Sequence, residues 1–245
     1  GHSAGGATLQ IAAFKPAPLQ ICGIGYFNTT GLSAMDYFLG DPICDPPDMD
    51  ALFVERILRL PHSHLCYAPE AIRVMPEAGY EPPLRKNGYV TFGSFNNFAK
   101  VTDEILLLWR GILESVRGSR LVIKGKICSI DSGINFVKKR LSMLNYDLTR
   151  VEFRPYSPDY LEQYRDIDIA LDTAPYNGGL TTCEALYMGV PVISLRGRTH
   201  GSRFGASILT NAGVRELVAE NDINYVRRAV QLAESPKLLE AYHMG

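Results

Sequence analysis

The stretch DTAPYNGGLTTCEALYMGVPVISL, residues 172–195, decides the fold of this chain. It follows an apolar run, 167–171, that predicts a buried strand interrupted only by Asp168. A loop with two adjacent glycines comes next, and residues 181–188 have the pattern of a helix. A Gly-Val-Pro sequence ends that helix, and residues 192–195 predict the next strand. The stretch therefore predicts a strand-loop-helix-strand unit.

Gly178 and Gly179 lie where the predicted helix begins. A helix N-terminus presents unpaired N–H groups and the positive end of the helix dipole, so a phosphate group fits there. Residues without a Cβ also let a ligand approach the backbone closely. The alternative is a turn with no ligand, followed by a capping box between Thr181 and Glu184. The local pattern does not decide between these interpretations.

Strands and helices alternate regularly around this unit. The predicted strands are 89–95, 119–124, 150–153, 167–171 and 192–195, and the predicted helices are 102–116, 132–144, 158–164, 181–188, 203–210 and 223–233. This alternation predicts an α/β fold with a parallel sheet covered on both faces. Ligands of such sheets bind at the carboxyl ends of the strands.

The N-terminal part of the chain is less regular. We expect helices at 8–14 and 50–55 and strands at 19–26, 36–39 and 57–60. Residues 68–88 are rich in proline, glycine and charge, which indicates a linker. The predicted organisation is therefore 1–67 as one part, 68–88 as a linker and 89–245 as a Rossmann-like lobe.

Lys100 lies just before the helix predicted to start at 102–104. A cation at this place opposes the helix dipole, which costs a little stability. Its presence is easier to understand if it faces an anion such as a diphosphate. The alternative is that Lys100 points into water or pairs with Asp103 or Glu104.

Composition excludes several function classes. The 245 residues are 46% hydrophobic with a net charge of −1 and no basic block, which argues against disorder and against a nucleic-acid partner. No apolar stretch has the length of a membrane span, and no signal peptide is visible. The five cysteines are scattered and form no C-x-x-C pair, so we expect reduced thiols in a cytoplasmic protein. The histidines have no metal-ligand spacing, and His62 and His64 are expected to be loop residues.

No Met stands at position 1, and the last residues, 244–245, come directly after a helical pattern. We therefore expect this chain to be a fragment of a longer protein.

Four stretches, in order, resemble glycosyltransferase family 41, which comprises O-GlcNAc transferases and SPINDLY-type O-fucosyltransferases. They are 15–20 followed by 25–26, 29–31 and 35–37; 95–97 with Lys100; 168–191; and 202–203 with 206–207 and 209–210. The resemblance covers nearly the whole chain and is most specific in 168–191. It implies a GT-B arrangement of two Rossmann-like lobes, with residues 1–67 as the end of the N-terminal, acceptor-side lobe.

The resemblance also implies roles for individual residues. Lys100 would contact the donor diphosphate and act in catalysis, Asn97 would lie near the nucleotide, and Glu184 would bind ribose hydroxyls. The loop that cradles the phosphates would comprise Asn177, Gly178, Gly179, Thr181 and Thr182. The acceptor-side turn would comprise Gly25, Tyr26 and Phe27.

The implied reaction transfers a sugar, GlcNAc from UDP-GlcNAc first among the candidates, to Ser or Thr hydroxyls of a protein or peptide acceptor. Negative charge builds on the leaving diphosphate, and a lysine with a helix N-terminus stabilises it without a metal ion or other cofactor. The resemblance further implies tetratricopeptide repeats upstream in the full-length protein.

This sequence departs from the family pattern at two places. The turn that is usually Gly-Tyr-Pro-Gly continues from Gly25-Tyr26 with Phe27 and Asn28, and Tyr160 stands where a histidine is common. The donor base and sugar therefore stay open, with GDP-fucose as the alternative donor. Two further alternatives are a nucleotide-sugar-binding remnant without activity and a GT-B enzyme that acts on non-protein acceptors.

Overall fold

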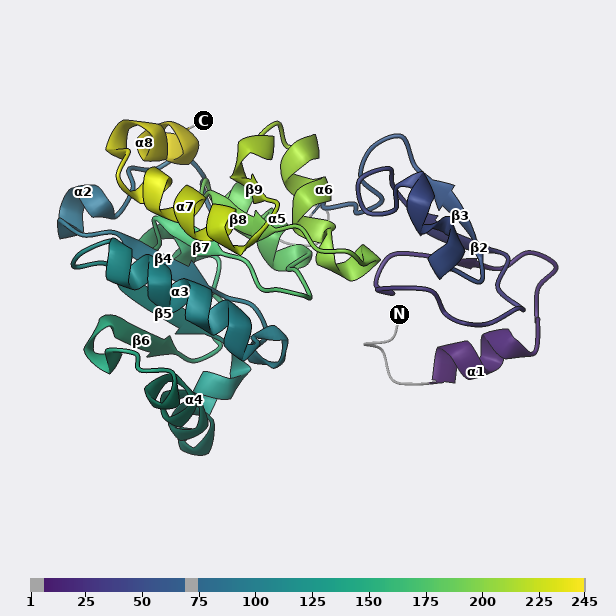
Figure 1. The fold of residues 1–245 in the computed structure, drawn as a ribbon, viewed down its shortest axis with the longest axis horizontal. Coiled ribbons are helices and arrows are strands. Elements are labelled where there is room, and N and C mark those ends of the chain that lie inside the picture. The colour runs from purple at the N-terminus through teal and green to yellow at the C-terminus, as the bar shows by residue number, and fades with distance from the viewer. Residues whose placement is uncertain (1–6, 69–74, 245) are drawn as a thin grey trace.

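The computed structural model describes residues 7–68 and 75–244. Two parallel sheets organise the molecule, one of three strands near the N-terminus and one of six strands in the larger, C-terminal part (Figure 1). The α/β fold class with a parallel sheet is therefore confirmed.

The larger sheet has the order β6-β5-β4-β7-β8-β9, and every neighbouring pair is parallel. Its strands are β4 (Thr91–Ser94), β5 (Arg120–Lys124), β6 (Val151–Arg154), β7 (Ile169–Leu171), β8 (Val192–Leu195) and β9 (Val218–Ala219). The chain moves outward from β4 to β6, then returns to place β7 beside β4 on the other side. The strand order thus reverses between β4 and β7, and such a switch point leaves a crevice for ligands at the carboxyl ends.

Helices connect these strands. They are α2 (Leu84–Asn87), α3 (Asp103–Ser115), α4 (Asp131–Met143), α5 (Leu180–Tyr187), α6 (Phe204–Asn211), α7 (Asp222–Ala233) and α8 (Pro236–Met244). α3 and α7 lie side by side across one face of the sheet, while α5 and α6 pack on β8 (Figure 1). Apolar residues at helical spacing on α3, among them Ile105, Trp109 and Ile112, are buried against the sheet, which explains why this segment forms a helix here.

The N-terminal part is small. α1 (Ala7–Ala13) precedes a parallel sheet in the order β1-β2-β3, formed by β1 (Ile21–Cys22), β2 (Tyr37–Gly40) and β3 (Arg56–Arg59). Its core contains Phe38, Met49 and Phe53. This little core buries few side chains, so the part gains stability from its contact with the larger part.

That contact is a buried polar junction. The Asp41 carboxylate accepts hydrogen bonds from the His64 ring (2.7 Å) on its own side and from the Ser207 hydroxyl (2.9 Å) on α6. Asp45 pairs with the His200 ring at 2.8 Å. These groups are almost completely buried, and each carboxylate has a partner, as buried charges require.

Several local expectations were wrong. The strand expected over 19–26 is only Ile21–Cys22, and the helices expected over 50–55 and 158–164 are 3₁₀ segments, Pro47–Leu52 and Glu162–Asp166. β9, α8 and α2 were not expected. α2 lies inside the segment 68–88, of which residues 69–74 are outside the described part; the division at 68–88 stays a prediction.

Candidate functional site

Two loops meet at the switch point between β4 and β7. Lys100, in the loop after β4, donates a hydrogen bond from its Nζ to the carbonyl oxygen of Asn177 at 3.0 Å. The same Nζ lies 3.7 Å from the centre of the Tyr176 ring. Lys100 therefore faces the glycine loop, and the alternative that it points into water or pairs with Asp103 or Glu104 is wrong. Asp103 instead pairs with Arg140.

The Lys100 amine is partly shielded from water. Burial lowers the pKa of its amine, and the nearby Asp172 carboxylate opposes this shift. A lysine with its charge held in a low-dielectric crevice interacts strongly with any anion that enters. The position suits a diphosphate, as the sequence analysis expected.

Asp172, directly after β7, binds the backbone of the glycine loop through its carboxylate. Its Oδ1 accepts hydrogen bonds from the Gly178 and Thr173 N–H groups at 2.7 and 2.8 Å, and its Oδ2 accepts one from the Ser194 hydroxyl at 2.6 Å. Complete burial raises the pKa of Asp172 to about 6, although these hydrogen bonds act in the other direction. Asp172 was not predicted as a site residue, and its only signal in the sequence was its place at the end of a buried strand.

Gly178 and Gly179 differ in the space that a Cβ would find at each position. A Cβ at Gly178 would lie 2.4 Å from Thr181 Oγ1 and 2.9 Å from Thr182 Oγ1, so the packing of the loop itself requires glycine there. A Cβ at Gly179 would meet only Phe204, at 3.9 Å. The open side of the loop is therefore at Gly179, which is also the N-cap of α5.

The alternative of a capping box between Thr181 and Glu184 is wrong, because α5 begins at Leu180 and its N-cap is Gly179, without any side-chain hydrogen bond. Thr181 donates to Asn96 Oδ1 and Thr182 to the Gly178 carbonyl, each at 3.0 Å. The first bond ties α5 to the loop after β4, and the first N–H groups of α5 have no capping side chain, which is the arrangement that favours an anion.

Glu184 lies buried on α5, and its carboxylate accepts a hydrogen bond from the Tyr160 hydroxyl. Tyr160 is the residue that stands where the family commonly has a histidine. The departure found in the sequence therefore contacts the very acid that the resemblance assigns to ribose binding. Tyr164, next to it, donates to the Thr181 carbonyl at 3.2 Å.

Asn97 and Asn177 have structural contacts of their own. Asn97 Oδ1 accepts from the Ala99 N–H at 3.1 Å and caps the short 3₁₀ segment that carries Lys100. Asn177 is fully buried, and its Nδ2 donates to the Thr173 carbonyl at 2.8 Å. Both residues position the loops. The backbone carbonyl of Asn177 also accepts the hydrogen bond from Lys100.

The turn expected on the acceptor side contacts Tyr176, the residue beside Lys100. The Phe27 ring lies 4.4 Å from that of Tyr176, and the Phe27 carbonyl accepts from the Gly201 N–H at 3.1 Å. Gly25 has a positive φ of 96°, and Tyr26 packs on the small core. Through Phe27, the N-terminal part thus contacts Tyr176, the ring over which the Lys100 amine lies.

One group of side chains has metal-ligand geometry. Possible ligand atoms of Asp41, Cys44 and His64 lie within 4.8 Å of one another, a grouping that sequence spacing did not reveal. However, the Asp41 oxygens already accept from the backbone N–H groups of Ile43, Cys44 and His64, besides the two side chains described above. These hydrogen bonds already use the oxygens of the Asp41 carboxylate. The expectation that the protein binds no metal stays a prediction.

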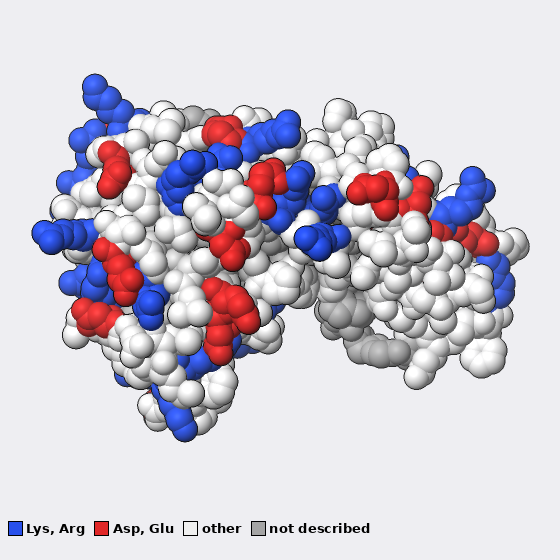
Figure 2. Space-filling view, viewed as in Figure 1, with Lys and Arg blue, Asp and Glu red and all other residues white. Residues whose placement is uncertain are grey.

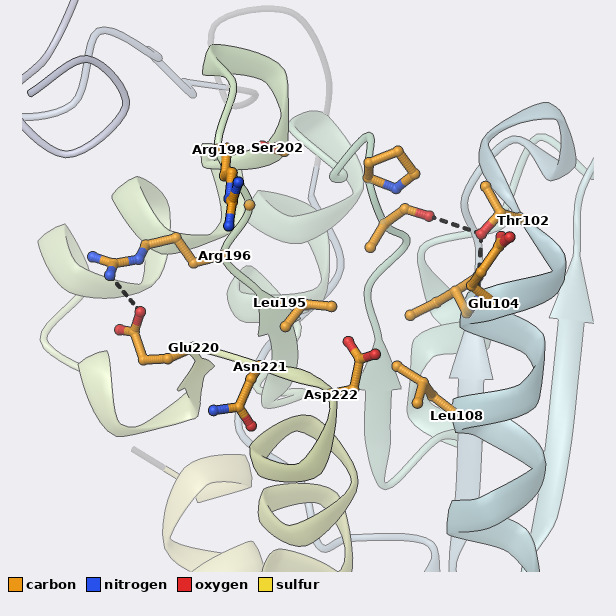
Figure 3. Close-up of a pocket in the computed structure, with 14 residues that line it drawn as sticks. Thr102, Glu104, Leu108, Leu195, Arg196, Arg198, Ser202, Glu220, Asn221 and Asp222 are labelled. Carbon is orange, nitrogen blue, oxygen red and sulfur yellow. Dashed lines mark hydrogen bonds and ion pairs between the residues drawn. The ribbon is translucent and has the colours of Figure 1, made fainter. Parts of the chain in front are cut away.

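A cavity of about 540 Å³ is lined in part by Ala174 and Pro175 of the segment before the glycine loop, and Figure 3 shows other residues of its lining. Leu108 and Leu195 line its floor, and Arg196 pairs with Glu220 at its edge. Thr102, the N-cap of α3, also lines this cavity and donates to the Ala174 carbonyl at 3.3 Å.

Comparison with known proteins decides the family. The model of glycosyl transferase family 41 matches residues 2–76 and 67–244. The chain belongs to this family. It is 44% identical over 238 residues to a protein of Eustoma exaltatum subsp. russellianum named as a probable UDP-N-acetylglucosamine–peptide N-acetylglucosaminyltransferase SPINDLY, covering 95% of this chain and 25% of that protein. The SPINDLY protein of Arabidopsis thaliana is 43% identical, covering all of this chain and 27% of that protein.

The chain is also similar in fold to a solved O-GlcNAc transferase structure. The K341M mutant of the O-GlcNAc transferase of Thermobaculum terrenum is 34% identical, with a TM-score of 0.85, over 96% of this chain and 45% of that one. The GT-B type of α/β fold is thereby confirmed for this member of the family. The chain spans only about a quarter of the length of its SPINDLY relatives. None of the helices in the described ranges has the length and apolar character needed to cross a bilayer.

Proposed function

We propose that this chain supplies the donor-binding lobe of a protein O-glycosyltransferase. The donor is UDP-GlcNAc and the acceptor a Ser or Thr hydroxyl of a protein or peptide. The observation that carries the proposal is Lys100, whose half-buried amine is held against the glycine loop at the switch point of the sheet. The names of the relatives and of the structural neighbour support the donor and the acceptor class.

Each group of site residues has its own role in donor binding or transfer in this proposal. Lys100 and the N-terminal N–H groups of α5, beside Gly178, Gly179, Thr181 and Thr182, stabilise the diphosphate as negative charge builds on it. Glu184 accepts hydrogen bonds from the ribose hydroxyls. Asn97 and Asn177 hold the loops around the nucleotide, and Gly25, Tyr26 and Phe27 border the acceptor side. A lysine and a helix N-terminus supply the positive charge, so the proposal needs neither metal nor cofactor.

The proposal extends to the whole protein. It places this lobe in a longer cytoplasmic enzyme with tetratricopeptide repeats upstream, which hold the acceptor. Five free cysteines support a reducing compartment.

A second candidate, O-fucosyl transfer from GDP-fucose, is favoured by one observation. Tyr160 replaces the common histidine and hydrogen-bonds Glu184, so the pocket for base and ribose differs from the usual one. UDP and GDP carry the same ribose and differ in the base, so a change in this pocket bears on which base is bound.

Radiolabelled transfer with the intact protein tests both candidates. UDP-GlcNAc and GDP-fucose are offered in parallel with a Ser/Thr-rich protein acceptor. Label on the acceptor from UDP-GlcNAc supports the first candidate, and label only from GDP-fucose supports the second. Donor binding without label from either, in a protein with both lobes present, would contradict both candidates and leave the nucleotide-sugar-binding remnant.

A further inference from the structure

A second recess, of about 240 Å³, lies at the junction of the two parts, and its lining does not include Lys100 or the glycine loop. One wall is the segment 42–46 of the N-terminal part, through Pro42, Ile43 and Pro46. The other wall belongs to the larger part, where α6 and the end of β8 meet β9. Any ligand in this recess would touch both parts of the molecule.

Three arginines from three different elements converge on this recess. Arg196 follows β8, Arg203 precedes α6, and Arg215 begins the short 3₁₀ segment before β9. The single carboxylate in the lining, Glu220, pairs with Arg196 at 2.5 Å. Figure 2 shows basic side chains gathered on this face where the two parts meet.

The other two arginines retain free donors. Arg203 uses its Nε for the Gly197 carbonyl at 3.0 Å and its Nη1 for the Ile43 carbonyl at 3.1 Å. Within 7–68 and 75–244, its Nη2 and the whole guanidinium of Arg215 have no hydrogen-bond or ion-pair partner. Exposed arginines are usually only solvated, but here one is fixed by two backbone carbonyls beside a recess of defined size.

The chemistry of the lining selects the ligand. Guanidinium groups bind phosphate through parallel N–H···O bonds, and a phosphate monoester carries a charge of about −1.5 to −2 at neutral pH, which matches two uncompensated arginines. The volume is just below the roughly 300–1,000 Å³ of ordinary ligand pockets, so it suits a small ligand. The apolar residues Pro42, Ile43 and Ala206 leave room for the organic part of an ester.

We propose that this recess binds a small phosphate monoester at a site separate from the donor diphosphate. Because the ligand contacts both parts of the molecule, it stabilises their docking. The proposal does not depend on which nucleotide sugar the enzyme uses.

Isothermal titration of the intact protein tests the site. O-phosphoserine and inorganic phosphate are the two probes, in chloride buffer of constant ionic strength with saturating UDP present. The variant is Arg215→Gln, whose side chain has no partner to lose. The control is Arg227→Gln, an exposed arginine on α7. We expect O-phosphoserine to bind despite UDP, at least tenfold more weakly in the Arg215 variant and unchanged in the control.

Each other outcome overturns the proposal. Competition by UDP, with loss of binding in Lys100→Ala, would place the phosphate in the donor site. Equal binding by the two arginine variants, or no binding of either probe, would show that the recess is only a solvated basic surface. Binding of inorganic phosphate but not of the ester would assign the recess to a bare ion. UDP affinity, measured in the same samples, reports separately on the donor site.

Discussion

At the scale of single residues, the proposed donor site separates two recognition tasks. Lys100 faces the glycine loop, where a diphosphate would lie, and Glu184 is buried one helical turn into α5 beside Tyr160. A substitution at one position should therefore affect one part of the nucleotide.

Glu184→Gln tests this division. The neutral amide accepts weaker hydrogen bonds from ribose hydroxyls than a carboxylate does, so we expect UDP affinity to fall roughly tenfold. Inorganic pyrophosphate, which lacks a ribose, should bind the variant and the unchanged protein equally. Calorimetric titration with both ligands checks this, and an equal loss for pyrophosphate would contradict a ribose role.

Asp172→Asn tests the charge beneath the loop. Burial raises the pKa of Asp172 from 3.8 to about 6, so the folded state holds this proton more tightly than the unfolded state does. The contribution of Asp172 to stability is therefore full below pH 4 and is lost as pH rises to about 6, by up to roughly 3 kcal/mol. Relative to the unchanged protein, the Asn variant should gain unfolding free energy over this interval. Urea unfolding at pH 4, 5, 6 and 7 measures it; a constant difference would contradict the raised pKa.

Prediction from sequence was uneven at this scale. The position of Lys100 before a helix indicated an anion, and the structure brings its amine to the glycine loop. Asp172 and Asn96 were missed, because their importance lies in hydrogen bonds to residues distant along the chain or across the sheet. The alternative of a capping box was wrong because α5 begins at Leu180 with Gly179 as its N-cap, and the Thr181 hydroxyl donates to Asn96 in the loop after β4.

At the scale of elements, the strand-loop-helix unit positions the site. Gly178→Ala would force a Cβ against two threonine hydroxyls, so we expect a loss of about 1–3 kcal/mol of unfolding free energy. Gly179→Ala is the comparison variant, since its Cβ would meet nothing closer than 3.9 Å and its φ of −103° is not in the left-handed region. Thermal unfolding of both variants measures the difference, and equal stabilities would contradict the packing role of Gly178.

Element prediction succeeded where periodicity was strong. The helices α3, α4 and α7 and the strands β4–β8 lie within a few residues of their predicted bounds. The two-residue strand β9 was not predicted, and β1 and the 3₁₀ segments at 47–52 and 162–166 were predicted with the wrong length or type, because tertiary contacts rather than local periodicity define them.

At the scale of the whole molecule, the buried Asp41 junction joins the two parts. Ser207→Ala removes the hydroxyl that α6 donates to this carboxylate, so we expect a loss of about 1–2 kcal/mol of unfolding free energy and faster hydrogen exchange in β2 and β3. Ser115→Ala, at the exposed end of α3, is the control. Unchanged exchange in β2 and β3 would show that Ser207 does not hold the parts together.

The central claim, a donor diphosphate on Lys100, is tested most directly by titrating UDP into the unchanged protein and into Lys100→Ala and Lys86→Ala. Lys86 is an exposed lysine of α2 and serves as the control. Loss of one charged hydrogen bond in a half-buried site corresponds to about a 10- to 100-fold weaker affinity. We predict this loss for Lys100→Ala only. Equal UDP affinity in all three proteins would contradict the account.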